Sequence, residues 1–190
     1  MRLFGLTIFT DCVYNLVMKR EKPHKWKVAP KEAVEIQKKL AGKIILRNAL
    51  KKLNYIAGVD VSYRNGNSIA SVCVLKYPEL ECVECEIAVC KTGFPYIPGL
   101  LTFREGPAVI KCVKKMRTKA DVFLFDGQGI AHPRWLGIAT HMGILLDTPA
   151  IGCAKSFLYG ECETGLGMQK GSFVFINEKN RKTRSGLKVA

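Results

Sequence analysis

The sequence predicts an α/β fold: a mixed sheet, made of a three-strand meander followed by parallel strands, with helices on both faces. Two observations carry this prediction. Three strand-like segments follow one another between residues 55 and 90, and helical and strand-like segments alternate after them. Strands joined by short turns pair antiparallel, whereas strands separated by helices pair in parallel. The length of 190 residues fits one domain with a developed core.

The first predicted helix covers residues 30–45. Its apolar face is formed by Val34, Gln37, Leu40, Ala41, Ile44 and Ile45, with lysines elsewhere, and Pro30 suits the first turn.

The strands and helices that follow are predicted in order along the chain. Strand-like segments cover 55–63, 68–76 and 81–90, and Asn65-Gly66 between the first two is a strong hairpin signal. Helical periodicity, with Val109, Ile110, Val113 and Met116 inward, predicts a helix over 107–117. The remaining elements are a buried strand at 121–126, a helix at 135–146 and a short strand at 150–154.

The charge is large and unevenly placed. The net charge is +14; residues 1–52 carry 13 Lys and Arg against 4 Asp and Glu, residues 170–190 carry 6 against 1, and the middle carries 11 of each. A neutral core between basic ends suits a protein that grips a phosphate backbone. The competing interpretation is a set of solvated lysines that keep the protein soluble.

Cysteine usage and the N-terminal segment bear on location. Cys73, Cys112 and Cys153 lie in apolar runs and are typical of small buried side chains in a reducing cytoplasm. Cys82-x-x-Cys85-x4-Cys90 raises a metal hypothesis, but it lies in a strand and has no second cysteine pair at zinc-finger spacing. Met1–Met18 is short, contains Asp11 and lacks a signal-peptide cleavage site, so we expect a cytoplasmic protein without a membrane partner.

Three acidic residues stand directly beside strongly apolar segments. Asp60 interrupts the first strand, Glu105 follows a loop rich in glycine and proline, and Asp126 ends a buried strand. Carboxylates in such surroundings repel one another and lose hydration unless a cation neutralises them. Mg²⁺ or Mn²⁺ suits these oxygen ligands. For any one acid alone, a satisfied buried carboxylate is the competing interpretation.

These positions are predicted to meet in one cleft. Ligands of mixed α/β sheets bind beyond strand ends, where the connection pattern changes. Asp60 and Asp126 occupy such positions, and Lys155 leaves the fifth strand.

Four motifs, in this order, resemble those of the endonuclease V family. They are Gly58-Val-Asp60-Val-Ser-Tyr63, Pro95-Tyr-Ile-Pro-Gly-Leu-Leu-Thr-Phe-Arg-Glu105, Asp126-Gly-Gln-Gly-Ile-Ala-His132-Pro-Arg and Ile151-Gly-Cys-Ala-Lys155-Ser. The resemblance covers about residues 30–176 and implies a ribonuclease H-like fold. It also implies an endonuclease that uses Mg²⁺, or Mn²⁺ as a substitute. Such an enzyme recognises deoxyinosine or inosine in DNA or RNA and hydrolyses the second phosphodiester bond 3′ to the lesion.

The resemblance assigns roles to the polar residues. Asp60, Glu105 and Asp126 become metal ligands, and Lys155 contacts the reacting phosphate or orients the attacking water. His132, held extended by Pro133, points from a loop to a phosphate or a metal-bound water. The alternative for His132 is a capping or core-satisfying histidine, and for Lys155 a surface lysine.

A second group of residues is expected to bind the substrate base. Tyr96 lies in a stiff loop between prolines and can fill the gap left by an extruded base; the alternative is a ring packed under the loop. Gly99, Gly127 and Gly152 let the backbone approach a flipped hypoxanthine, although glycine is also ordinary at turns.

Two departures from the family pattern concern the ends of the chain. Residues 1–25 read as an N-terminal extension of unknown role, and 26–190 as a single domain that is shorter at its C-terminus than family members. We expect a monomer. Two other functions remain open: a structure-selective nuclease without lesion specificity, and a non-catalytic nucleic-acid-binding module.

Overall fold

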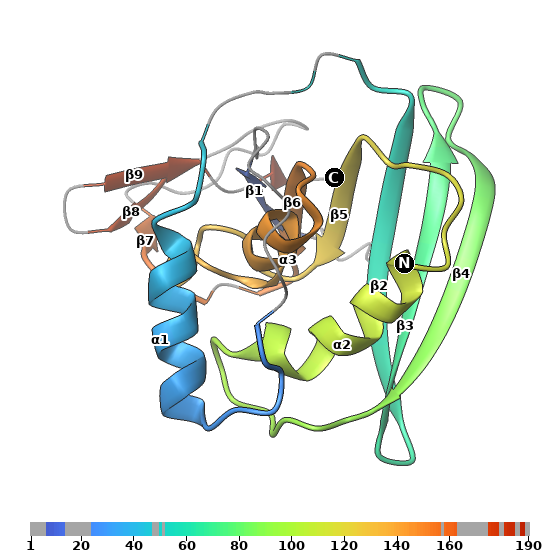
Figure 1. Cartoon of the computed structure of the whole chain (residues 1–190). Helices are drawn as coiled ribbons and strands as arrows, with labels where there is room; N and C mark the ends of the chain where they lie inside the picture. Colours follow the sequence, from blue (N-terminus) through green and yellow to red (C-terminus); the bar gives the residue numbers. More distant parts are fainter. Residues whose placement is uncertain are drawn as a thin grey trace, which may run out of the picture.

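A mixed sheet forms the centre of the molecule (Figure 1). The computed structural model describes residues 7–13, 24–46, 50, 52–156, 158–162, 175–178, 181–184 and 187–188. Its elements, in chain order, are β1 (Thr7–Val13), α1 (Pro30–Ala41), β2 (Tyr55–Arg64), β3 (Asn67–Lys76), β4 (Glu81–Lys91), α2 (Leu101–Val113), β5 (Val122–Asp126), α3 (Ile138–Leu146), β6 (Ala150–Ala154), β7 (Glu161–Cys162), β8 (Phe175–Glu178), β9 (Arg181–Arg184) and β10 (Leu187–Lys188).

The strand order of the main sheet is β10-β1-β6-β5-β2-β3-β4. β2, β3 and β4 form an antiparallel meander, and β5 lies parallel to both β2 and β6. Asn65 and Gly66 have φ angles of 49° and 73°, which the two-residue hairpin between β2 and β3 requires. The predicted meander and the parallel strands after it are therefore confirmed.

The core lies on one face of the sheet. Ala57 of β2 and Phe123 of β5 stand side by side in the parallel register, and both belong to a buried cluster with Val109 of α2 and Met142 of α3. α1 packs against α3, at the side of this helical layer (Figure 1). The predicted mixed sheet with packed helices is therefore confirmed.

Two helices begin at other residues than the periodicity predicts. α2 spans Leu101–Val113 in place of 107–117, so Pro107 lies inside the helix, and Phe103 on the turn before it is buried. The predicted range follows from the periodicity of Val109, Ile110, Val113 and Met116, whereas proline is unfavourable inside a helix; here tertiary packing of the first turns outweighs that local preference. α3 begins at Ile138, not at 135, because Trp135 has a φ of 59° that a right-handed helix excludes.

The cysteines of the meander also differ from expectation. Cys73 lies opposite Cys85 in the register of β3 and β4, and a disulfide joins them. The prediction that Cys73 is a reduced hydrophobic side chain is therefore wrong, because strand register places a second cysteine directly across from it. The disulfide also removes Cys85 from the Cys82/Cys85/Cys90 metal hypothesis, and the described residues hold Cys82 and Cys90 as free thiols.

The ends of the chain contribute strands. β1, within the predicted N-terminal extension, pairs antiparallel with β6 and with β10. Residues 1–6 and 14–23 of that extension lie outside the described residues. β7, β8 and β9 form a separate antiparallel sheet. Among the described residues, none of the helices has the length and apolar character needed to cross a membrane.

Candidate active site

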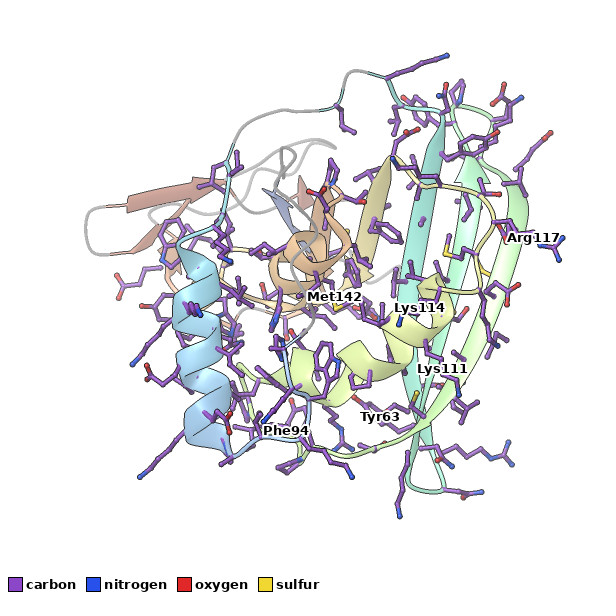
Figure 2. All side chains as sticks on the ribbon, in the orientation of Figure 1. Tyr63, Phe94, Lys111, Lys114, Arg117 and Met142 are labelled. Carbon is purple, nitrogen blue, oxygen red and sulfur yellow. A yellow bond between two sulfur atoms is a disulfide. The ribbon has the colours of Figure 1, made fainter. Side chains whose placement is uncertain are left out.

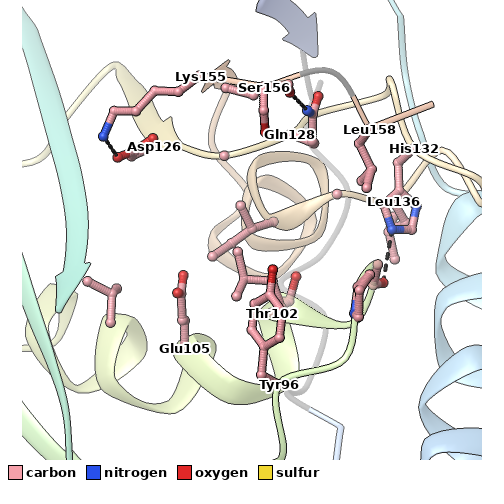
Figure 3. Close-up of a pocket in the computed structure, with 18 of the residues that line it drawn as sticks. Tyr96, Thr102, Glu105, Asp126, Gln128, His132, Leu136, Lys155, Ser156 and Leu158 are labelled. Atoms are coloured by element: carbon pink, nitrogen blue, oxygen red, sulfur yellow. Dashed lines mark hydrogen bonds and ion pairs between the residues drawn. The ribbon is translucent and has the colours of Figure 1, made fainter. Parts of the chain in front are cut away.

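A pocket of about 310 Å³ lies where β2 runs past the end of β5, between the sheet and the first turns of α2 (Figure 3). Eight of the nine predicted site residues line this pocket. They are Asp60, Tyr96, Gly99, Glu105, Asp126, Gly127, His132 and Lys155. The structure thus brings together residues that are up to 95 positions apart in the sequence.

The three carboxylates reach the pocket from different elements. Asp60 comes from β2, Asp126 from the last position of β5 and Glu105 from α2. Glu105 is buried, with 7% of its surface exposed, whereas Asp60 and Asp126 are exposed. The expectation of three buried acids is therefore met by Glu105 alone, because β2 leaves the core after Val59 and β5 ends at the surface.

Glu105 is the carboxylate whose protonation the fold changes most. Burial raises its pKa to about 7, the neighbouring Asp60 and Asp126 add to this rise, and a hydrogen bond from the Tyr63 hydroxyl opposes it. The Tyr63 oxygen lies 2.6 Å from Glu105 Oε1. Negative charge is thus concentrated around one buried carboxylate, an arrangement that suits a cation.

Lys155 supplies positive charge to the same pocket. Its Nζ lies 2.5 Å from Asp126 Oδ2, and this hydrogen bond raises the pKa of the lysine (Figure 3). Lys155 therefore stays protonated and faces the pocket, where it can attract a phosphate.

The carboxylates fit a divalent cation by their chemistry. Within the described part of the chain, no three His, Cys, Asp or Glu side chains are already drawn together as a closed ligand group. Asp60 and Asp126 nevertheless lie near enough to Glu105 to raise its pKa by their negative charge. Oxygen donors of this kind suit Mg²⁺ or Mn²⁺ rather than softer metals.

His132 anchors a loop. It is 2% exposed; its Nε2 lies 2.9 Å from the Gly99 carbonyl oxygen, and its Nδ1 accepts the backbone N–H of Arg134. Burial lowers its pKa to about 4. Both ring nitrogens are thus engaged, an arrangement closer to the core-satisfying alternative than to a side chain aimed at a phosphate.

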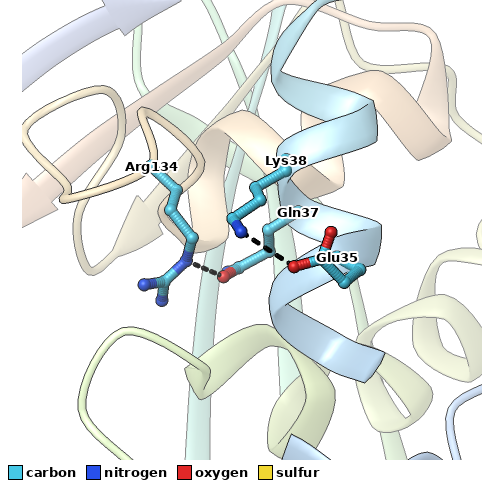
Figure 4. A network of polar contacts seen from close by, with 4 residues as sticks. All are labelled: Glu35, Gln37, Lys38 and Arg134. Carbon is cyan, nitrogen blue, oxygen red and sulfur yellow. Dashed lines mark hydrogen bonds and ion pairs between the residues drawn. The ribbon is translucent and has the colours of Figure 1, made fainter. Parts of the chain in front are cut away.

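Two further residues complete this anchor. Gln37 Nε2 and Arg134 Nη2 each donate to the Gly99 carbonyl at 2.9 Å. Arg134 Nε also donates to Gln37 Oε1 at 2.6 Å (Figure 4). α1, the loop before α2 and the loop after β5 are thereby joined at one carbonyl oxygen.

The glycines differ in what they do. Gly99 has a φ of +79°, and an added Cβ would lie 2.8 Å from Arg134 Nη2. Gly127 has a φ of +153°, and its Cβ would lie 2.6 Å from the Ile138 side chain. Gly152 is not among the pocket's lining residues; it is buried against the backbone of residues 127–129, where a Cβ would lie 2.4 Å from Gly129 N. Gly152 therefore shapes the pocket from behind.

Tyr96 is well exposed at the mouth of the pocket, with 71% of its surface open to solvent (Figure 3). The ring is not packed under its loop, so the structure favours a ring available to substrate over the packing alternative.

Several residues that contact the pocket residues are given no role in the site by the sequence prediction. Tyr63 appears there only as the end of a motif, and Gln37 only as one of an apolar helix face. Gln37 carries a signal, because a polar residue on such a face needs a buried partner. For Tyr63 and Arg104 no local pattern marks the contact, since their partners come from other elements.

The chain matches one protein family over most of its length. A family model described as Endonuclease V matches residues 38–189. The curated endonuclease V of Dictyoglomus turgidum is 46% identical over 155 residues, which cover 82% of this chain and 67% of that protein.

Solved structures agree with this match. The crystal structure of endonuclease V from Bacillus subtilis superposes with a TM-score of 0.75 at 26% identity, covering 87% of this chain and 78% of the other. The structure of Ciona intestinalis endonuclease V, in complex with a 24mer DNA containing an inosine followed by a ribo-adenosine, has a TM-score of 0.65 at 26% identity and covers 83% and 81%. The mixed α/β class predicted from the sequence is therefore confirmed.

Proposed function

Since this chain belongs to the endonuclease V family, a family of nucleases, we propose that it is a divalent-metal-dependent endonuclease acting on inosine in nucleic acid. We further propose that it hydrolyses the second phosphodiester bond 3′ to the lesion. The observation that carries the proposal is the gathering of Asp60, Glu105, Asp126 and Lys155 around one pocket, with Tyr96 exposed at its mouth.

Asp60, Glu105 and Asp126 would hold the cation. Bound there, Mg²⁺ or Mn²⁺ supplies Lewis-acid chemistry to the scissile phosphate and lowers the pKa of a water ligand. The chain's own contribution is the concentration of negative charge around Glu105, which would favour a cation beside these three carboxylates.

Lys155 acts on the phosphate through its charge. Protonated beside Asp126, its ammonium group stabilises the negative charge that develops on the phosphate oxygens. Because its side chain is 69% exposed, Lys155 can leave Asp126 and turn toward a bound strand without breaking any packing.

The loop around Tyr96 and Gly99 binds the base. Extruding a base from a duplex leaves a gap, which the exposed Tyr96 ring is placed to fill. Gly99 and Gly127 line the pocket and let backbone groups come close to a flipped hypoxanthine. Gly152 assists by letting the 127–129 loop pack closely. We assign His132 to holding the Gly99 loop in place, not to proton transfer.

We propose both DNA and RNA containing inosine as candidate substrates. The Ciona intestinalis relative is bound to DNA with a ribo-adenosine after the inosine. Discrimination between the two nucleic acids depends on contacts to the 2′-hydroxyl, so both belong in the experiment.

The test is cleavage of labelled oligonucleotides with and without one inosine, as DNA and as RNA, in Mg²⁺, Mn²⁺ or EDTA. We expect metal-dependent nicking of the inosine strands at the second 3′ phosphodiester. Asp60→Ala and Asp126→Ala should abolish nicking without loss of folding, because the cation that activates the phosphate and the water would lose a ligand. Glu79→Ala, in the exposed turn between β3 and β4, is the matched control and should cleave normally.

Other outcomes identify the alternatives. Indiscriminate nicking would indicate a structure-selective nuclease, and retention of the strands without nicking would indicate a binding module. Mg²⁺-dependent turnover at the wild-type rate by Asp126→Ala would refute the ligand assignment.

A further inference from the structure

A tyrosine outside the predicted site touches the buried carboxylate of the pocket. Tyr63 lies near the end of β2 beside α2 (Figure 2), and its hydroxyl donates a hydrogen bond of 2.6 Å to Glu105 Oε1. We propose that Tyr63 is a positioning residue, whose hydroxyl holds the Glu105 carboxylate in the orientation that binds the catalytic cation. This inference rests on the proposed function, in which Glu105 is a metal ligand.

Glu105 needs such a partner more than the other two acids do. Its long side chain loses rotamer freedom when it is ordered, and a buried carboxylate without a hydrogen bond is unfavourable. Within the described residues, Tyr63 is the side chain that donates to this carboxylate. Asp60, by contrast, accepts a hydrogen bond from the adjacent Val61 N–H, and Asp126 accepts one from the Lys155 ammonium group.

Tyr63 is itself held in place although 43% of its surface is exposed. The guanidinium carbon of Arg104 lies 4.5 Å from the centre of its ring. Arg104 Nη1 in turn donates to the Phe94 carbonyl oxygen at 2.8 Å, at the start of the loop that carries Tyr96. The hydroxyl therefore projects from a fixed ring, which is the condition for positioning another side chain.

The hydroxyl can be removed without changing the packing. Tyr63→Phe keeps the ring under Arg104 and takes away only the oxygen that bonds Glu105. Hydrogen-bond partners of metal ligands typically contribute ten- to a hundredfold in metal affinity or activity. Because Tyr63 is partly exposed and water can replace its hydroxyl, we expect the lower end, about tenfold.

The experiment measures Mn²⁺ binding to the full chain, by the electron paramagnetic resonance signal of free Mn²⁺. Wild type, Tyr63→Phe and Tyr77→Phe are compared, because Tyr77 has a similar exposed fraction, 45%, in the turn after β3. Tyr63→Phe should bind Mn²⁺ about tenfold more weakly and need about tenfold more Mn²⁺ for half-maximal nicking. Its KM for the inosine strand at saturating Mn²⁺ should stay unchanged, as should all properties of Tyr77→Phe.

Each result separates this inference from the proposed function. Wild-type Mn²⁺ affinity in Tyr63→Phe overturns the positioning role, even if the wild type nicks inosine strands. Weaker Mn²⁺ binding in Tyr63→Phe, with a wild type that nicks nothing, supports the positioning role and removes the proposed function. A raised KM at saturating Mn²⁺ would instead make Tyr63 a substrate contact, and a wild type that binds no Mn²⁺ overturns both proposals.

Discussion

Tyr96 has the largest exposed fraction of the large hydrophobic side chains that the structure describes. Two prolines, Pro95 and Pro98, restrict the backbone on either side of it, so little further entropy is lost when the ring inserts into a base stack. Its place at the mouth of the pocket agrees with the proposed function, in which the ring contacts a nucleic-acid base.

We therefore expect Tyr96→Ala to weaken binding to an inosine-containing duplex by about tenfold or more, because stacking on an aromatic ring contributes about 1–3 kcal/mol per base. The loss on an inosine-containing single strand should be smaller, since no base pair has to be opened there. Affinities measured in Ca²⁺, which suppresses turnover, give the comparison. An equal loss on both substrates would mean that Tyr96 stacks on any strand, and no loss on either would assign it to the loop alone.

The loop before α2 illustrates how an element is held from a distance. Its Gly99 carbonyl accepts hydrogen bonds from Gln37, His132 and Arg134, which come from α1 and from the loop after β5. Each donor is separated from Gly99 by more than thirty residues. The orientation of this loop, and with it that of Tyr96, thus depends on tertiary contacts and not on the local turn.

Gln37→Leu tests this dependence. Gln37 is buried, and its loss leaves Arg134 Nε and the Leu136 carbonyl without their partner, so the free energy of unfolding should fall by about 1–3 kcal/mol. We also expect a raised KM for inosine strands with little change in Mn²⁺ affinity, because the carboxylates are not touched. Urea unfolding and steady-state kinetics measure the two effects.

The control lies one residue along the same helix. Lys38 pairs with Glu35 on the surface (Figure 4), and both side chains are more than half exposed. Lys38→Ala should therefore change stability by less than about 0.5 kcal/mol and leave KM as it is. If Gln37→Leu behaved like Lys38→Ala, the Gly99 anchor would not control the loop.

For the whole molecule, buried titratable groups set the response to pH. Burial lowers the pKa of His132 to about 4 and holds that of His141 well below its ordinary value of 6.5. Below pH 6.5 the unfolded chain gains protons on these histidines that the folded protein cannot take up, so stability is lost as the pH falls. Glu105 has the opposite effect on stability. Its pKa is raised from 4.5 to about 7, so its contribution to the free energy of unfolding is fully present below pH 4.5 and is lost as the pH rises through 7.

We expect the free energy of unfolding in EDTA to fall between pH 6.5 and 5, because the lowered pKa values of three histidines, His24, His132 and His141, outweigh the single raised pKa of Glu105. In Glu105→Gln the opposing contribution is gone, so the loss over this range should be larger than in the wild type by up to about 2 kcal/mol. Urea unfolding of both proteins across this range gives the two slopes. Parallel curves would show that the pKa of Glu105 is not raised in the folded protein.

The sequence by itself determined the elements whose signals are local. The Asn65-Gly66 hairpin follows from the positive φ angles that these residues tolerate, and β5 and β6 follow from short apolar runs. The gathering of Asp60, Asp126 and Lys155 was also predictable, because parallel strands deliver the residues at their ends to the same edge of a sheet. The four motifs led to the family.

Only the tertiary structure decided how the remaining side chains are used. Pro107 lies inside α2 because packing outweighs local propensity, and this places Glu105 on a helix within reach of Tyr63. His132 faces the Gly99 carbonyl and Cys73 faces Cys85, contacts that depend on which loops and strands become neighbours. A sequence pattern reports the preference of a residue for a conformation, whereas the partner of a buried polar group is set by the chain that folds against it.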